Sequence, residues 1–372
     1  MYLKIAWRNL YKSKISSFIN IIGLATGMAV VLLIGLWIWD ELSYNKYHAN
    51  YDSIARLMRH TDMNGKISTR SSMAVPLRDE LASGYGGSFK QLVLASPDEA
   101  HVLMAGSNKV LQNGRFMQPG AIDMLSLKML SGSSLQAQDP SAIFLSVSAA
   151  KILFGDADPA GKIVKIDNRM TVHVAGIYED VPYQSDFHDL MFVASWDLLA
   201  ATDDWAQKAR RSWSIHSFEL FAQVAPHVDM EKLSASIAAT ELNHYDKAVA
   251  ARRKTGLFLF PMSRWHLYPE WKDGINTGGR VQLVWLFGVI GALALLLACI
   301  NFMNLTTARA EKRAKEVGVR KAVGSRQGQL VNQCFSESML ITCIAFMVAL
   351  LLTRTIVPFF DQVADKKIMV PW

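Results

Sequence analysis

The amino-acid sequence predicts a membrane protein in which α-helical transmembrane spans carry a large inserted extracytoplasmic α+β domain. The chain of 372 residues has a mean hydropathy of +0.15 and only 19% charged residues, which is more apolar than an ordinary soluble enzyme. It contains long uncharged runs, and the bases behind its net charge of +7 gather beside them. A nucleic-acid-binding domain would carry its bases as a patch on a polar folded unit, so we expect no nucleic-acid partner.

Residues 1–17 are expected to form an amphipathic basic helix on the cytoplasmic face of the membrane, in contact with lipid. The segment contains four bases and no acid, and its apolar residues and its bases recur at helical spacing on different faces. The residues assigned to this membrane-surface helix are Lys4, Trp7, Arg8 and Lys12. Two interpretations stay open: the helix only anchors the chain, or it also braces a partner under the membrane.

Three apolar runs are predicted to cross the membrane. Residues 18–39 contain no Asp, Glu, Lys or Arg, and as a helix they rise about 33 Å, enough to cross the hydrocarbon core. Residues 281–305 form the second span. The third, 339–360, begins with a shorter uncharged run and continues past Arg354, whose side chain can snorkel to the interface.

The distribution of bases orients these spans, because the cytoplasmic flanks of transmembrane helices are rich in Lys and Arg. The predicted order is a cytoplasmic N-terminus, span one, an external domain of residues 40–280, span two and a cytoplasmic loop of residues 306–338. Span three then leads to an external tail of residues 361–372, with a fourth span missing. The expected location is the bacterial inner membrane, with the large domain in the periplasm.

The external domain is expected to be α+β, because strand-like and helix-like segments alternate without a repeated βα unit. Strands are predicted at 54–60, 92–96, 102–105, 143–146, 162–167, 170–181, 190–194, 218–224 and 257–260, and helices at 76–82, 147–153 and 229–247. Hairpin turns are predicted at Asn113-Gly114 and at Asp167-Asn168. Since none of the three cysteines lies in this region, no disulfide is expected in it.

The sequence offers no catalytic site and no metal site. The stretch from Gly155 to Lys162 looks like a phosphate-binding loop, but five residues separate its glycines instead of four, and Ile163 stands where Ser or Thr should bind Mg²⁺. A turn between a helix and a strand is the better interpretation. The nine histidines are scattered without metal-ligand spacing. We predict that the chain is not itself an enzyme and holds no cofactor.

Two further segments suggest a mechanical role. Gly23 and Gly27 form a GxxxG pattern in span one, which would let a second helix approach closely, although single matches also arise by chance. Residues 308–329 read ARAEKRAKEVGVRKAVGSRQGQ, in which Ala, Lys and Glu favour helix and Gly324-Ser325 favours a break followed by a new helix. Such a loop can be a topology signal alone or a rigid handle that a cytoplasmic protein pushes.

Several segments of the sequence resemble those of a known protein family. The order of basic helix, span, external α+β domain, span and basic loop resembles the MacB/FtsX-type permease of ABC transporters. Three stretches are similar to that family: EVGVRKAVGSRQGQLVNQCFSESML (316–340), LSVSAAKILFGDADPAGK (145–162) and WRNLYKSKISSFINIIGLATGMA (7–29). The resemblance covers almost the whole chain, and the loop after span two is its most specific part.

The resemblance implies that the cytoplasmic loop docks on a separate ABC ATPase subunit, which would hold the ATP and Mg²⁺. Motion of the ATPase would move spans one and two and do conformational work on the external domain, for efflux, lipoprotein release or transmembrane signalling. The ATPase-coupling residues implied are Glu316, Val317, Gly318, Arg320, Lys321 and Gly324. It also implies a homo-dimer or pseudo-dimer of permease modules, and a periplasmic or outer-membrane partner.

Two departures from the family pattern leave alternatives open. The family module has a fourth span, so we expect this chain to be the first part of a longer permease or an inactive fragment of one. Around Ser325 the sequence reads Gly-Ser-Arg where the family usually has Gly-Ala-Ser. The main rival is a membrane-anchored receptor with an external sensing domain, although a third apolar run soon after the basic loop argues against it.

Overall fold

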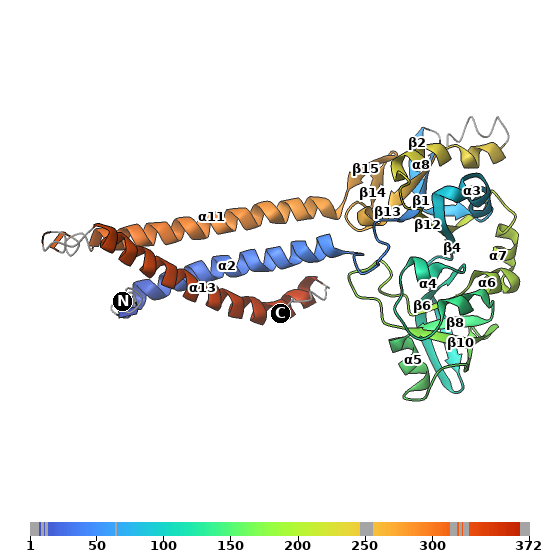
Figure 1. Ribbon diagram of the computed structural model, residues 1–372, viewed down its shortest axis with the longest axis horizontal. Helices are drawn as coiled ribbons and strands as arrows, with labels where there is room; N and C mark the ends of the chain where they lie inside the picture. Colours follow the sequence, from blue (N-terminus) through green and yellow to red (C-terminus); the bar gives the residue numbers. More distant parts are fainter. Residues whose placement is uncertain are drawn as a thin grey trace. The chain divides into compact units, whose positions relative to one another are not determined.

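The computed structural model describes residues 14–63, 65–245, 256–312 and 327–364, with residues 7, 8, 11, 318, 319 and 322. The chain divides into two compact units: a helical unit of Met1–Leu42 with Gln282–Trp372, and an external unit of Ser43–Val281. Within the described residues, the long helices of the helical unit are α2 (Lys14–Ser43), α11 (Arg280–Lys312) and α13 (Gln327–Ala364) (Figure 1).

Each of these helices contains a stretch that is long and apolar enough to cross a membrane. In the described chain these stretches are Ser17–Ser43, Arg280–Ala308 and Val331–Phe359. The helices extend beyond the runs predicted at 18–39, 281–305 and 339–360, because hydropathy marks only the apolar part of a helix while Ala, Lys, Gln and Glu continue it. Both ends of the 306–338 loop are therefore helical, as α11 continues to Lys312 and α13 begins at Gln327.

Lobe one of the external unit is an antiparallel sheet. Its strands run in the order β13-β1-β12-β4, with β2 added to β1 and β3 added to β12. Their bounds are β1 Ile54–Met63, β2 Lys66–Arg70, β3 Ser72–Ala74, β4 Phe89–Ala95, β12 His216–Val224 and β13 Gly256–Pro261. Buried aliphatic residues of these strands pack against helices α3 (Leu77–Tyr85) and α8 (Met230–Ile237) to form one core.

Lobe two is a closed barrel. Its strands follow the order β6-β5-β9-β10-β8-β11, and β11 pairs in parallel with β6 to close the ring. Their bounds are β5 Glu99–Ala105, β6 Asn108–Met117, β8 Ala142–Ser146, β9 Ile163–Ile166, β10 Met170–Tyr178 and β11 Phe192–Ser195. The interior is filled by apolar side chains such as Phe116 and Phe192 and covered by α5 (Val147–Phe154).

The remaining short elements of the described chain connect these two lobes or decorate them. They are η1 Gly86–Ser88, α4 Ala121–Met124, β7 Met129–Gly132, η2 Ser134–Gln138, α6 Trp196–Thr202, α7 Asp204–Ala209, η3 Thr240–His244, α10 Met262–Trp265, β14 Glu270–Lys272 and β15 Ile275–Gly278. Strand β7 pairs with β10, and β14 pairs with β15 as a separate hairpin.

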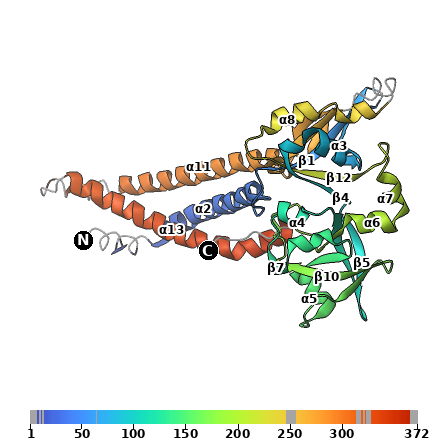
Figure 2. The ribbon, with the colours of Figure 1, turned by 45° about the vertical axis from the view of Figure 1, so that its right-hand side comes forward.

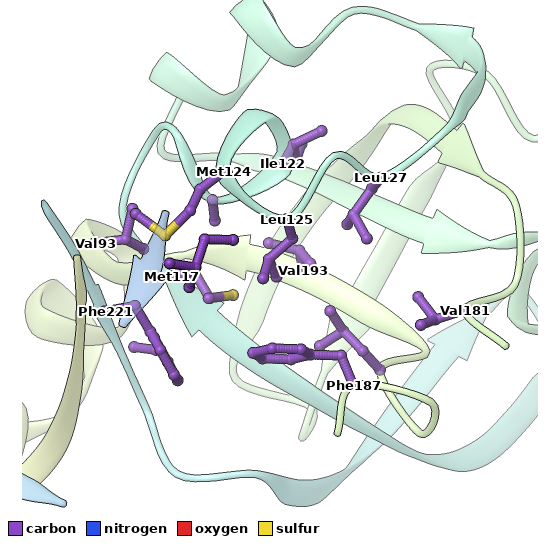
Figure 3. Packing of buried hydrophobic residues seen from close by; sticks show 14 of the residues in the cluster. Val93, Met117, Ile122, Met124, Leu125, Leu127, Val181, Phe187, Val193 and Phe221 are labelled. Carbon is purple, nitrogen blue, oxygen red and sulfur yellow. The ribbon is translucent and has the colours of Figure 1, made fainter. Parts of the chain in front are cut away.

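The two lobes meet where β4 of lobe one pairs with β6 of lobe two, at Ala95 and Met117. A third apolar cluster covers this junction. Figure 3 shows side chains from both lobes in it, among them Val93 and Phe221 of lobe one and Met117 and Val193 of lobe two. Because the cluster is shared, the lobes form one domain.

The predicted turn at Asn113-Gly114 is wrong, because both residues lie inside β6. Glycine is required there for another reason: a Cβ atom at Gly114 would overlap the ring of Phe192, which fills the barrel. The chain instead turns at Gly106, which has φ +57° and follows the last residue of β5.

The predicted turn at Asp167-Asn168 is confirmed, since both residues have positive φ, 51° and 56°, between the paired strands β9 and β10. The stretch from Gly155 to Lys162 is also confirmed as a turn between α5 and β9, with φ +63° at Gly155. The helix predicted at 229–247 is too long, because α8 ends at Ile237 and a separate short helix, η3, follows.

Candidate functional site

Most of the residues assigned from the sequence to the membrane surface and to ATPase coupling lie outside the described residues. They are Lys4, Lys12, Glu316, Val317, Arg320, Lys321 and Gly324. Of the others, Trp7, Arg8 and Gly318 are helical and exposed. The coupling role of the loop therefore stays a prediction from the sequence.

Gly23 and Gly27 lie where α2 packs against α11. A Cβ atom at Gly27 would lie 2.5 Å from the Cβ of Ala298, and one at Gly23 would lie 2.9 Å from Nδ2 of Asn301. Nearer the other end of the same pair of helices, the ring centroids of Trp37 and Phe287 are 4.8 Å apart. The helices thus run antiparallel and side by side (Figure 2), and small residues permit the close approach of their backbones.

Helix α13 joins this packing through a stripe of small residues. Ala345 and Ala349 are fully buried and form one cluster with Ala25 and Ala29 of α2. Next to this cluster in the sequence, Asn20 is only 1% exposed, and its amide oxygen and nitrogen have no hydrogen-bond partner among the described residues. The three helices are therefore held by close contacts between small side chains, with a polar group enclosed near one end.

Asn45, two residues after the end of α2, fixes the start of the external unit. It is fully buried and has φ +64°, a left-handed conformation that asparagine tolerates better than most residues. Its Nδ2 donates to Oδ2 of Asp186 at 2.7 Å, and its Oδ1 accepts from the backbone N–H of Asp186 at 2.8 Å. The backbone N–H of Asn45 also donates to the carbonyl of Gln184 at 2.7 Å.

His48 makes the second connection from this segment. Its Nδ1 lies 2.6 Å from the carbonyl oxygen of Leu125 and must donate a hydrogen to it, which leaves Nε2, 2.8 Å away, to accept from the hydroxyl of Ser185. Burial lowers the pKa of His48, although the bond to Leu125 and the nearby Asp186 act in the opposite direction. The ring is therefore neutral. We call Asn45 and His48, with their partners, the linker clamp.

The segments that follow α2 and precede α11 are also joined inside the external unit. The rings of Tyr44 and His266 stack with centroids 3.6 Å apart and an interplanar angle of 12°. A little further along, the backbone N–H of Val281, at the start of α11, donates to the carbonyl of Leu267 at 3.1 Å. Both connecting segments are therefore anchored by contacts within the external unit.

A partly buried ion cluster lies where the lobes meet. Nη1 of Arg115 on β6 is 2.5 Å from Oε2 of Glu219 on β12, and Nη1 of Arg56 on β1 is 3.5 Å from Oε1 of Glu219. Burial alone would raise the pKa of Glu219, but the two guanidinium groups and the hydrogen bonds from Arg115 and Ser71 outweigh burial and lower it. The carboxylate is therefore ionised and ties lobe one to lobe two.

The same cluster reaches the linker clamp. The guanidinium of Arg115 lies 5.7 Å from the ring centroid of Phe187, which directly follows the clamp residues Ser185 and Asp186. One loop thus contacts both the segment after α2 and the ion cluster between the lobes. Sequence analysis missed this arrangement, because the clamp joins residues 77 to 141 positions apart.

Acidification is expected to weaken the linker clamp. Below about pH 6.5, the ordinary pKa of histidine, the unfolded chain binds a proton at residue 48 that the folded chain does not, so stability falls as the pH falls. The loss is at most about 1.4 kcal/mol per pH unit for one proton. Hydrogen exchange of residues 43–50 between pH 7.5 and 5.5, corrected for intrinsic rates, measures it. An equal pH dependence in His48→Gln would contradict this account.

No grouping of three or more His, Cys, Asp or Glu side chains placed to hold a metal ion occurs within the described ranges. The cysteines Cys299, Cys334 and Cys343 are free thiols in the helical unit. The described chain instead presents close helix packing in the helical unit, and the linker clamp and the ion cluster in the external unit.

Two sequence profiles match the chain. The profile of the MacB-like periplasmic core domain matches residues 17–240, and that of the FtsX-like permease C-terminal matches residues 288–372. The first match covers more than half of the chain.

Two relatives illustrate the similarity. The macrolide export ATP-binding/permease protein MacB of Marinobacter nauticus is 23% identical over 233 residues, which cover 60% of this chain and 32% of that protein. The pyoverdine export ATP-binding/permease protein PvdT of Pseudomonas savastanoi pv. phaseolicola is 23% identical over 371 residues, which cover 93% of this chain and 50% of that protein. The chain thus spans half or less of the length of these relatives.

Among solved structures, the periplasmic region of MacB from Actinobacillus actinomycetemcomitans is similar, with a TM-score of 0.41 and 14% sequence identity. The match covers 57% of this chain and 90% of that structure.

Proposed function

The chain belongs to the family of proteins with a MacB-like periplasmic core domain, and from this premise we propose that it is a membrane subunit of an ABC transporter. In this proposal it couples ATP hydrolysis by a separate cytoplasmic ATPase to conformational work of its external domain. The observation that carries the coupling is the linker clamp, because the chain leaves α2 and within two residues is fixed by Asn45.

The proposed sequence of events starts at the cytoplasmic loop. Docking and closure of the ATPase at Glu316–Gly324 moves α2 and α11 relative to one another. Movement of α2 pulls on Asn45 and His48, and these residues displace the loop that contains Ser185 and Asp186. Because that loop also contacts Arg115, the displacement changes how the two lobes are held together at Glu219.

The proposed topology is an inner-membrane protein with a cytoplasmic N-terminus and a periplasmic external domain. The four bases in residues 1–17 and the basic loop after α11 support this orientation, because such flanks remain cytoplasmic. The relatives named above are export proteins, so we infer export as the direction of transport. Two copies of the permease module, each with its ATPase, are expected to form the working assembly.

A pull-down tests the partner. Full-length tagged chain is recovered from native membranes with and without the double reversal Arg320→Glu/Lys321→Glu, and ABC ATPase subunits are scored by mass spectrometry. The reversal is expected to remove the ATPase, because both bases lie in the proposed docking segment. The matched reversal Arg313→Glu/Lys315→Glu changes the charge equally outside that segment and is expected to retain it. Recovery of no ATPase with the unchanged chain would overturn the proposal. So would equal recovery with the Arg320→Glu/Lys321→Glu and Arg313→Glu/Lys315→Glu variants.

A second arm tests the clamp. In the assembled complex, Asn45→Ala is expected to leave ATPase recovery unchanged but to abolish the ATP-dependent change in hydrogen exchange of the loop around Ser185. The reason is that this variant removes both side-chain bonds to Asp186 without touching the helices. An ATP-dependent change that persists in Asn45→Ala would show that coupling takes another route.

A further inference from the structure

A cleft of about 580 Å³ opens in the external domain between α6–α7 and the strands of both lobes. Figure 1 shows α6 and α7 along one side of the domain, next to the junction of the lobes. The cleft is lined by the turn between β4 and β5, by β5 and β6 of lobe two, and by the start of β12 of lobe one. Its volume lies within the range of small-molecule sites in proteins, about 300–1,000 Å³.

Aromatic rings form much of its wall. Trp205 of α7 is 55% exposed, which is unusual for a residue of this size in a folded domain, and it borders the cleft. His101, which also lines the cleft, is held by a 2.6 Å contact between its Nδ1 and Oδ2 of Asp167 and packs edge-on against Phe116, with centroids 5.3 Å apart. The ring of His101 is therefore fixed before any ligand arrives.

The cleft is lined by acidic residues and by no described Lys or Arg. The acidic residues are Glu99 and Asp203. Oδ1 of Asp203 accepts a hydrogen bond from the backbone N–H of Ala206 at 2.8 Å, which fixes this carboxylate at the start of α7. No described residue forms a salt bridge with either carboxylate. Glu99 and Asp203 therefore have no positively charged partner among the described residues, and they line the same cleft as the exposed indole of Trp205.

We propose that this cleft is a binding site for an amphipathic organic cation. The face of an aromatic ring attracts a cation, most strongly in the case of Trp, and the carboxylates of Glu99 and Asp203 add a complementary charge. The apolar body of the ligand would lie against the exposed ring of Trp205 and the partly buried side chain of Leu199, which both line the cleft. This inference goes beyond the proposed coupling to an ATPase, since it concerns the external domain alone.

The test uses the full chain in lipid nanodiscs without any ATPase, so its outcome is independent of the proposed function. The probes are rhodamine 6G, a cationic xanthene dye, and sulforhodamine B, an anionic dye of the same ring system. Binding is followed by fluorescence anisotropy, with empty nanodiscs subtracted. We expect the cationic dye to bind at least tenfold more tightly than the anionic one.

Variants assign that binding to the cleft. Trp205→Ala and Glu99→Gln are each expected to weaken binding of rhodamine 6G about fivefold, while Trp205→Phe retains most of it. Asp156→Asn removes an exposed carboxylate from another surface and should change nothing. Thermal unfolding midpoints verify that the variants are folded. Equal binding of the two dyes, binding no stronger than to empty nanodiscs, or binding unchanged by Trp205→Ala and Glu99→Gln would each overturn the proposal.

Discussion

Glu219→Gln is expected to lower the free energy of unfolding of the external domain by about 1–3 kcal/mol, because it leaves two guanidinium groups in a partly buried site without their counter-charge. The substitution keeps the shape of the side chain and removes only its charge. Arg115 and Arg56, whose side chains are 12% and 26% exposed, would then face each other without the carboxylate that now separates their charges. Hydrogen exchange of β6 and β12 in the full chain measures the loss.

The matched control is Glu179→Gln. Glu179 pairs with Lys128 at 3.1 Å, but both side chains are about half exposed or more, at 49% and 66%. Exposed pairs contribute roughly 0–1 kcal/mol, so this variant should be nearly neutral. If the two Glu→Gln changes cost the same, the Glu219 cluster does not hold the lobes together.

Gly27→Ala is expected to disrupt the packing of α2 against α11, with a cost of about 1–3 kcal/mol from overpacking. The new methyl group would lie 2.5 Å from the Cβ of Ala298, and Ala298 is itself buried. The measurement is the thermal unfolding of the full chain in nanodiscs. Gly35→Ala on the same helix is the control, since nothing lies within 4 Å of a Cβ atom there.

A double variant that exchanges the two residues tests the same helix contact in a second way. In the double variant Gly27→Ala/Ala298→Gly, the methyl group moves from α11 to α2, and its nearest neighbour on residue 298 becomes the Cα atom at 3.7 Å, an ordinary contact. The swap should therefore restore most of the stability that Gly27→Ala removes. A double variant less stable than Gly27→Ala would contradict the helix contact described here.

The predicted fold class and the resemblance to a MacB/FtsX-type permease are both confirmed. Hydropathy could find the helices, because each apolar run is a local property of the chain. The uncharged run at 339–352 was too short by itself, and the helix that contains it, α13, extends from Gln327 to Ala364. Short strands such as β3 and β7 were missed, because three or four residues carry too little alternation to stand out.

The barrel and the clamp could not be predicted, because they depend on contacts between distant parts of the chain. Closure of lobe two pairs Phe192 with Gly114, and nothing in either local sequence indicates that pairing. Glu219 gave no clear signal, since a charged residue between Phe218 and Leu220 also fits a strand with one solvent-facing side. Only the fold shows that its side chain is 16% exposed and has an ionic partner. The identity of that partner, Arg115, required the three-dimensional arrangement.

The closure of lobe two also limits how other proteins can bind this domain. A sheet with an open edge can be extended by a strand from a partner, but a closed barrel has no such edge. At the far end of lobe one, the edge of β13 is occupied as well. The backbone N–H groups of Leu257 and Leu259 donate to Ala238 and to Oγ of Ser234, in and beside α8.

Other described strands keep a free edge, among them β2, which pairs only with β1, and β4, which pairs with β6 only at Ala95 and Met117. Addition of a partner's strand is therefore blocked at the closed ring of lobe two and hindered at β13, and it is confined to edges such as those of β2 and β4. Lobe two and the edge of β13 are protected in this way against edge-to-edge aggregation, in a domain that contains no cysteine and so no disulfide.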